Sequence, residues 1–231
     1  MADLHPQVSP VDLLRWAEAL SGVARTGLGF TQSLYERERF EEVLRIAADI
    51  RAAAVEETEA EEQFEEWLRS VGKGVAGYVT PKVAVAAVVA DDEGRMLLTQ
   101  RADSGVWLYP VGWADVGYSA SEIAVKEVYE ETGIEVEPLR LIAVFDALRL
   151  GFALLPLYSI VFHCRVIGGE LKGHPLETRD VGFFGRDSLP HPLAGGGFWV
   201  DVAFRAIAGE QVATFFDPPR VPPWKGDPGS S

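Results

Sequence analysis

The segment from Ser119 to Gly133 carries its own start and stop signals for a helix. Ser119 and Glu122 form a capping box at the start, and Gly133 suits the left-handed position that follows a helix. Apolar runs typical of strands lie on both sides of this segment. A helix set between strands in this way favours an α/β fold, with a mixed sheet sandwiched between helices.

The expected strands are apolar runs bounded by turn residues. Val83–Ala90 predicts a buried strand, the turn Asp91–Gly94 ends it, and Met96–Arg101 is its hairpin partner. The chain then offers three further strand candidates and a final helix: Leu139–Phe145, Leu157–Ile167, Val181–Phe184 and about Trp199 to Ala208.

The N-terminal part of the chain has a helical pattern instead. Ser9-Pro10-Val11-Asp12 predicts a helix start, Thr26–Gly29 is expected to break that helix, and a second helix is expected from about Ser33. An acidic run over Glu56–Glu66 predicts the solvated face of a third helix. Helices of this size bury little surface on their own, so they must pack on the rest of the chain or on another copy. Our hypothesis is that they form a small helical domain that builds a homodimer.

Composition places the boundaries between these parts. The stretch Val71–Pro81 holds three glycines and a proline and predicts a linker. We therefore expect an N-terminal helical domain over residues 1–75 and an α/β domain over residues 76–215. A flexible, proline-rich tail is expected over residues 216–231.

Charge and cysteine content exclude several classes of protein. The net charge of −14 argues against a protein that binds DNA through its bulk field, and a phosphorylated substrate would need a local cation. The single cysteine, Cys164, allows neither an intrachain disulfide nor a zinc cluster and suits a reducing compartment. No secretory signal and no apolar stretch of membrane-spanning length is evident, so a cytoplasmic protein is expected.

Three carboxylates of the expected central helix share one arc. Glu127, Glu130 and Glu131 are spaced i, i+3 and i+4, so their charges repel one another. A hard divalent cation such as Mg²⁺ removes this repulsion and prefers carboxylate oxygens. Taken alone, the pattern also fits a solvated acidic helix face.

The segment Gly112–Ile134 resembles the Nudix box, which runs Gly, five residues, Glu, seven residues, then Arg-Glu-apolar-x-Glu-Glu-x-Gly-apolar. Gly112 takes the first position, and the second half is matched by Glu127, Val128, Glu130, Glu131, Gly133 and Ile134. Tyr118 stands where the family has the first Glu, and Lys126 where it has Arg. Lysine keeps the charge but lacks the planar fork of arginine.

This resemblance implies a Nudix-type α/β/α sandwich and a hydrolase that uses Mg²⁺, with Mn²⁺ as a possible substitute. Glu127, Glu130 and Glu131 would hold the metal, while Gly112, Lys126 and Gly133 would shape the box. Either Glu131 or Glu177 would take the proton of the attacking water. Arg101, Trp113 and Tyr118 are the candidate substrate contacts, although each could instead have only a surface or packing role.

A narrower resemblance concerns the N-terminal residues and the box loop. Trp16-Ala17, Thr26-Gly27-Leu28, Tyr35–Phe40 and the loop Gly112–Tyr118 resemble the Nudix subfamily that acts on X-linked nucleoside diphosphates, which includes CDP-choline pyrophosphatases. This implies a CDP-choline-type or ADP-ribose-type substrate that yields a nucleoside monophosphate and a phosphorylated X. A non-catalytic, nucleotide-sensing module and a hydrolase of damaged nucleoside triphosphates are the alternatives.

Overall fold

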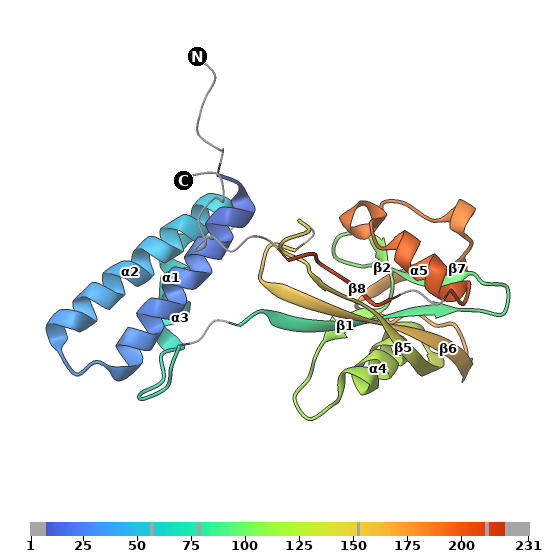
Figure 1. Cartoon of the computed structure of the whole chain (residues 1–231), viewed down its shortest axis with the longest axis horizontal. Coiled ribbons are helices and arrows are strands. Elements are labelled where there is room, and N and C mark those ends of the chain that lie inside the picture. The colour runs from blue at the N-terminus through green and yellow to red at the C-terminus, as the bar shows by residue number, and fades with distance from the viewer. Residues whose placement is uncertain (1–7, 56–57, 78–79, 152, 211–212, 220–231) are drawn as a thin grey trace, which may run out of the picture. The chain divides into compact units, whose positions relative to one another are not determined.

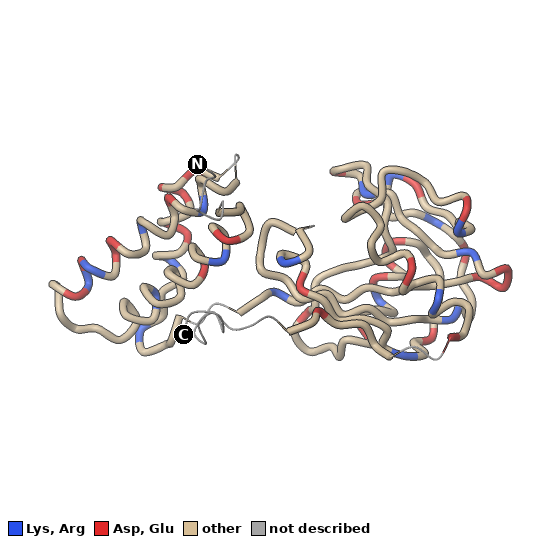
Figure 2. Tube along the Cα trace, turned by 45° about the horizontal axis from the view of Figure 1, so that its top comes forward, with Lys and Arg blue, Asp and Glu red and all other residues tan. Residues whose placement is uncertain are grey.

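The structure is a computed structural model that describes residues 8–55, 58–77, 80–151, 153–210 and 213–219. The chain divides into two compact units (Figure 1). One comprises Met1–Lys82 with Ala147–Leu157, and the other comprises Val83–Asp146 with Tyr158–Ser231. Acidic and basic residues are interspersed along the trace of each unit (Figure 2).

Within the described residues, the second unit is built on a sheet of eight strands. Their bounds are β1 Lys82–Ala90, β2 Met96–Arg101, β3 Trp107–Leu108, β4 Val111–Trp113, β5 Ile134–Asp146, β6 Leu157–Gly169, β7 Thr178–Phe184 and β8 Phe215–Phe216. The main path runs β3-β2-β1-β6-β5-β8, with β4 paired to β1 and β7 to β2. The β5–β8 pair is parallel and the β5–β6 pair antiparallel, so the sheet is mixed, as predicted.

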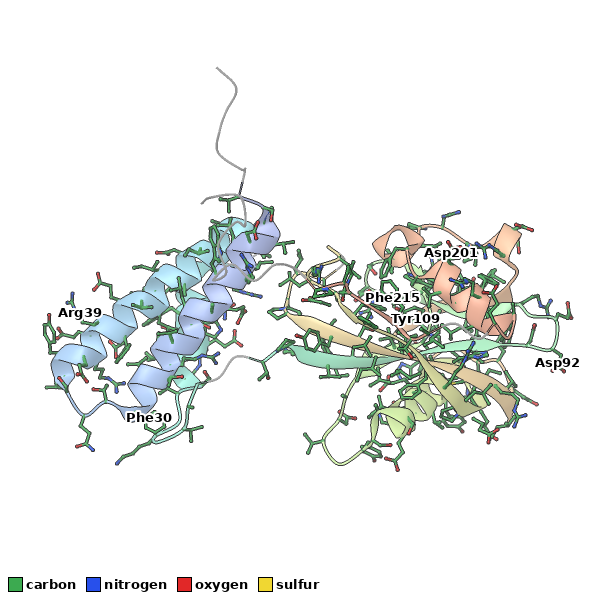
Figure 3. All side chains as sticks on the ribbon, viewed as in Figure 1. Phe30, Arg39, Asp92, Tyr109, Asp201 and Phe215 are labelled. Carbon is green, nitrogen blue, oxygen red and sulfur yellow. The ribbon has the colours of Figure 1, made fainter. Side chains whose placement is uncertain are left out.

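The helices α4 (Ala120–Thr132) and α5 (Val200–Ile207) lie on opposite faces of the sheet (Figure 1). Ile123, Ala124 and Val128 of α4 pack in one buried cluster with alternate residues of β1 and with Cys164. On the α5 side, the Tyr109 ring meets Trp199 edge to face at 4.7 Å, and Phe215 lies close by (Figure 3). Burial on both faces explains why β1 is a continuous apolar run, and the predicted α/β/α sandwich is confirmed.

Several strand bounds differ from those expected. β5 begins at Ile134, directly after Gly133, instead of at Leu139, and β3, β4 and β8 were not predicted. These three strands have two or three residues each, too few to show a period of two. The expected flexible tail is also shorter at its start, because Phe216 pairs with Val144 in β8. The rest of the tail, residues 220–231, lies outside the described residues.

The first unit contains α1 (Pro10–Phe30), α2 (Leu34–Ala54) and α3 (Ala60–Arg69). Ser9 forms the predicted capping box with Asp12, and Ser33 caps α2. The three helices share one apolar core, made of Ala17, Ala24, Leu28, Leu44, Ala47, Ala48, Phe64 and Trp67. In the parts of the chain that are described, no helix is long and apolar enough to cross a membrane.

The predicted helix break at Thr26–Gly29 is wrong, since α1 continues to Phe30. Its glycines serve close packing and do not end the helix. A Cβ on Gly29 would lie 2.6 Å from the carbonyl oxygen of Val75, and the Gly74 N–H donates to the Gly29 carbonyl at 2.7 Å. Part of the expected linker is therefore fixed against α1. Residues 78–79 of that linker lie outside the described residues.

Candidate active site

The central helix α4 begins and ends where its sequence predicts. The Glu122 N–H donates to Ser119 Oγ at 3.3 Å, and the Ser119 N–H donates to Glu122 Oε2 at 2.6 Å. Gly133 ends the helix with a φ of +71°, and its N–H donates to the Tyr129 carbonyl at 2.8 Å. These two ends fix the rotation of the helix, and so they fix the face on which its carboxylates lie.

A cleft of about 490 Å³ lies along this helix. Its lining comes from β2 and the loop after it, from β4, from α4 and from the segment before β7: Thr99, Arg101, Ala102, Asp103, Val111, Gly112, Trp113, Asp115, Lys126, Glu127, Glu130, Glu131, Leu176, Glu177 and Thr178. Residues separated by almost eighty positions in the sequence thus line one cleft.

Glu131 is the most perturbed of the α4 carboxylates. Its side chain is buried, with 8% of the residue exposed, and its Oε2 accepts a hydrogen bond from Thr99 Oγ1 at 3.3 Å. Burial, followed by the negative charge of Glu127, raises the pKa of Glu131 to about 8. The backbone N–H of Val111 opposes this rise by donating to the carboxylate.

Glu127 lies against the backbone of β4. Its carboxylate occupies the space that a side chain at position 112 would need, because a Cβ built on Gly112 would overlap it. Burial raises the pKa of Glu127, and the attraction of the neighbouring Lys126 opposes the rise. Position 112 therefore requires glycine in this structure, because a larger residue would collide with the Glu127 carboxylate.

Lys126 connects the helix to the loop before it. Its Nζ lies 2.9 Å from Glu130 Oε2 and 3.4 Å from both Glu127 Oε1 and Asp115 Oδ2. The hydrogen bond to Glu130 is the main reason why the pKa of Lys126 lies above its usual value. This lysine thus partly neutralises the carboxylate arc, without the bidentate geometry that arginine would provide.

We call the lining from α4 one wall of the cleft, and the lining from β2, the loop after it and the segment before β7 the opposite wall. The opposite wall carries Arg101 and Glu177. The Arg101 guanidinium is held by Asp103, with Nε 3.0 Å from Oδ1 and Nη2 2.6 Å from Oδ2. The Ala102 N–H donates to the Glu177 carbonyl at 2.8 Å and so joins the two loops. β7 begins at Thr178, three residues before the expected strand start at Val181, so the loop that carries Glu177 ends earlier than predicted.

Two of the predicted site residues, Tyr118 and Gly133, lie outside this cleft lining. Tyr118 is 56% exposed in the loop before α4, and Gly133 lies at the far end of the helix. Trp113 does line the cleft and is half exposed. The substrate contacts of Trp113 and Tyr118 stay predictions.

Sequence reasoning missed three residues that contact the predicted ones, namely Thr99, Asp103 and Asp115. Thr99 could have been noticed in the sequence, because it is a polar residue that directly follows the apolar run Met96–Leu98 in the same expected strand. Asp103 and Asp115 lie in loops, where an acidic residue is ordinary. Their partners become apparent only from the fold.

The carboxylates suit a divalent cation in their chemistry. Glu127 and Glu131 are two adjacent buried oxygen donors, each with a pKa raised chiefly by burial, and a hard cation would relieve that cost. Across the described residues, no three acidic, histidine or cysteine side chains converge closely enough to hold an ion as they stand. Glu130 is turned to Lys126 in this structure, so the third donor would have to exchange that partner for the ion.

Two family models match the chain. The NUDIX domain matches residues 80–198, and the "UDP-X-like, N-terminal oligomerisation domain" matches residues 11–67. Members of the Nudix family generally use divalent metal ions.

Individual relatives agree with both matches. The Bacillus subtilis (strain 168) protein YjhB is 33% identical over 183 residues, which cover 78% of this chain and 84% of YjhB. A crystal structure of a UDP-X diphosphatase has 28% identity and a TM-score of 0.55, covering 90% of this chain and 100% of that one.

A second solved structure is similar over the catalytic part. It is an ADP-ribose pyrophosphatase from Streptococcus suis 89-1591, with 34% identity and a TM-score of 0.53, and the match covers 60% of this chain and 100% of that one. These matches indicate the same family as the box residues and as the sheet with its two covering helices. The chain therefore belongs to the Nudix family of hydrolases and is a pyrophosphohydrolase.

Proposed function

We propose that this enzyme hydrolyses, with Mg²⁺, the pyrophosphate bond of a nucleoside diphosphate linked to a second group X. The products are a nucleoside monophosphate and a phosphorylated X, and the substrate is of the CDP-choline or ADP-ribose type. The observation that carries the proposal is the cleft, which gathers three carboxylates on one wall and Arg101 with Glu177 on the other. The matched UDP-X diphosphatase and ADP-ribose pyrophosphatase support the substrate class.

Metal binding, substrate binding and proton transfer are assigned to residues on the two walls of the cleft. Glu127, Glu130 and Glu131 would hold the divalent ion, which would neutralise the diphosphate and acidify water when bound; we expect Mn²⁺ to substitute for Mg²⁺. Arg101 contacts a phosphate, and Trp113, at the rim of the cleft, contacts the nucleoside or X. Either Glu131 or Glu177 accepts the proton of the attacking water.

Amide substitutions test the metal site. We expect Glu130→Gln and Glu131→Gln each to reduce Mg²⁺-dependent release of nucleoside monophosphate by at least about a hundredfold, because the ion loses a charged ligand. Glu93→Gln is the matched control, since Glu93 is an exposed carboxylate at the β1–β2 turn. Full activity of both active-site variants would reject this assignment of the site.

A substrate panel tests the substrate class. It compares CDP-choline, ADP-ribose, NADH, diadenosine polyphosphates and nucleoside triphosphates in water enriched in ¹⁸O, and mass spectrometry locates the label on one product. We expect the highest kcat/KM for a diphosphate diester. Preferential turnover of triphosphates would favour a hydrolase of damaged nucleotides, and binding without turnover of any compound would favour a nucleotide-sensing module.

The N-terminal helices are proposed to join two copies of the chain in a homodimer. The match of residues 11–67 to an oligomerisation domain supports this. We also propose a cytoplasmic location, because the single cysteine, Cys164, is buried as a free thiol and suits a reducing compartment.

A further inference from the structure

The segment Lys172–Thr178, between β6 and β7, links the two walls of the cleft. At one end it caps α4, since the Lys172 N–H donates to the Thr132 carbonyl at 2.7 Å and the His174 N–H to the Glu131 carbonyl at 3.1 Å. These carbonyls belong to the last turn of the helix, where they have no partner within the helix. At the other end, the Glu177 carbonyl accepts from the Ala102 N–H at 2.8 Å.

His174 is the residue around which this segment turns. Its Nδ1 accepts from the backbone N–H groups of Leu176 at 3.4 Å and Glu177 at 3.3 Å. Its carbonyl accepts from the Thr178 N–H at 3.0 Å. One residue thus contacts, through backbone and side chain, the main chain of Glu131 and of Glu177, the two candidate proton acceptors.

The imidazole takes a place usually filled by Asn or Asp. A side-chain acceptor that captures the N–H groups two and three residues later closes a turn of the Asx type. The His174 ring is half-buried, whereas Leu176 and Glu177 are exposed, so no burial of side chains holds these two residues in place. The hydrogen bonds to Nδ1 therefore act with the Ala102–Glu177 and Thr178–His174 backbone hydrogen bonds to fix where the Glu177 side chain enters the cleft.

We propose that His174 is a positioning residue of this enzyme, which holds Glu177 over the carboxylates of α4 through a turn closed on its Nδ1. The inference rests on the proposed function, in particular on Glu177 as the group that accepts the proton of water. His174 does not touch substrate in this scheme and exerts its effect through the main chain of Glu177.

Two substitutions at position 174 separate this role from general structural support. Asparagine is the conservative variant, because its Oδ1 occupies the place of Nδ1 relative to the backbone and can accept the same N–H groups. His174→Ala removes the acceptor. Lys172→Ala is the matched control, since it truncates an exposed side chain of the same segment and leaves the backbone N–H in place.

Amide hydrogen exchange and steady-state kinetics are the two measurements. In His174→Ala we expect faster exchange at Leu176 and Glu177, and a kcat lower by about ten- to a hundredfold with KM within about twofold, as for a misplaced base. His174→Asn and Lys172→Ala should match the wild type in exchange and stay within about threefold of its kcat. In a Glu177→Gln background, His174→Ala should have no additional effect on kcat, because the group it positions has been removed.

The outcomes distinguish this inference from the proposed function. Unchanged exchange and kcat in His174→Ala, alongside a damaged Glu177→Gln, would overturn the positioning role alone. Full activity of Glu177→Gln would overturn the role of Glu177 and this inference with it. A wild-type chain that hydrolyses no compound of the panel would overturn the proposed function itself and leave no positioning role to assign.

Discussion

Glu131 is buried next to Glu127 in the cleft, and this makes the stability of the metal-free protein depend on pH. Burial, then repulsion by Glu127, raises the pKa of Glu131 from 4.5 to about 8. Folding therefore takes up a proton between these values. The stabilisation is fully present below about pH 4.5 and is lost as the pH rises through about 8.

Glu131→Gln should behave like the protonated residue at every pH. In EDTA we expect its Tm to exceed that of the wild type by several degrees at pH 8, with the difference shrinking towards pH 5. Mg²⁺ should raise the wild-type Tm at pH 8 more than that of the variant. Parallel Tm profiles of the two proteins across this pH range would contradict the assigned burial cost.

Gly112 supplies a second test at the residue scale. A Cβ at this position would overlap the Glu127 carboxylate, so Gly112→Ala should displace a proposed metal ligand. We expect kcat/KM to fall by about a hundredfold or more, while circular dichroism shows an intact fold. Gly185→Ala is the matched control, because a Cβ there would lie 3.4 Å from Ser188 Oγ and the backbone φ is −70°. Equal activity of the two variants would show that the Glu127 carboxylate can move without loss.

At the scale of the element, α1 shows a helix glycine that is required by packing. Replacing a glycine within a helix by alanine normally stabilises the helix, by up to about 1 kcal/mol in the helix interior. At Gly29, however, a Cβ would lie 2.6 Å from the Val75 carbonyl oxygen and 2.8 Å from that of Gly72. Backbone atoms cannot rotate away as a side chain can, so overpacking of about 1 to 3 kcal/mol should dominate. We expect Gly29→Ala to lower the thermal unfolding temperature, and an increase would contradict this packing.

The same comparison shows which elements the sequence could predict. α4 is marked by Ser119, Glu122 and Gly133, whose effects are local, and the arc of Glu127, Glu130 and Glu131 follows from the helical period alone. The continuation of α1 through its glycines could not be predicted, because the reason lies in contacts with Gly72 and Val75, more than forty residues later.

The contacts of residues on the opposite wall could not be predicted from the sequence either, because they also depend on distant parts of the chain. The contact of Thr99 with Glu131 depends on the pairing of β2 and on the docking of α4. The turn closed by His174 depends on a side-chain acceptor that is uncommon at such a position. A motif thus locates the wall formed by α4, whereas strand pairing and loop geometry decide what faces it.

At the scale of the whole molecule, the proposed homodimer has a candidate surface on α1. Trp16, Val23 and Phe30 are exposed by 42%, 61% and 58%, and Phe30 marks the C-terminal end of the helix (Figure 3). A spacing of seven residues places them along one side of the helix, as in the seam of a coiled coil. A carboxylate in such a seam would have to be buried without a partner. We therefore expect Val23→Glu to convert the dimer to a monomer, measured by light scattering at micromolar concentration.

The catalytic consequence of this change follows from where the cleft lies. Its lining runs from Thr99 to Thr178, within one unit of one chain, so a monomer should keep the complete site. We expect Val23→Glu to retain kcat within about threefold at a temperature below its own unfolding transition, since dissociation removes no cleft residue but does lower the apparent stability. Asp49→Arg, an exposed charge change on α2, is the control and should stay dimeric. A Val23→Glu protein that stays dimeric would reject the α1 surface, whereas a folded but inactive monomer would show that the partner copy contributes to catalysis.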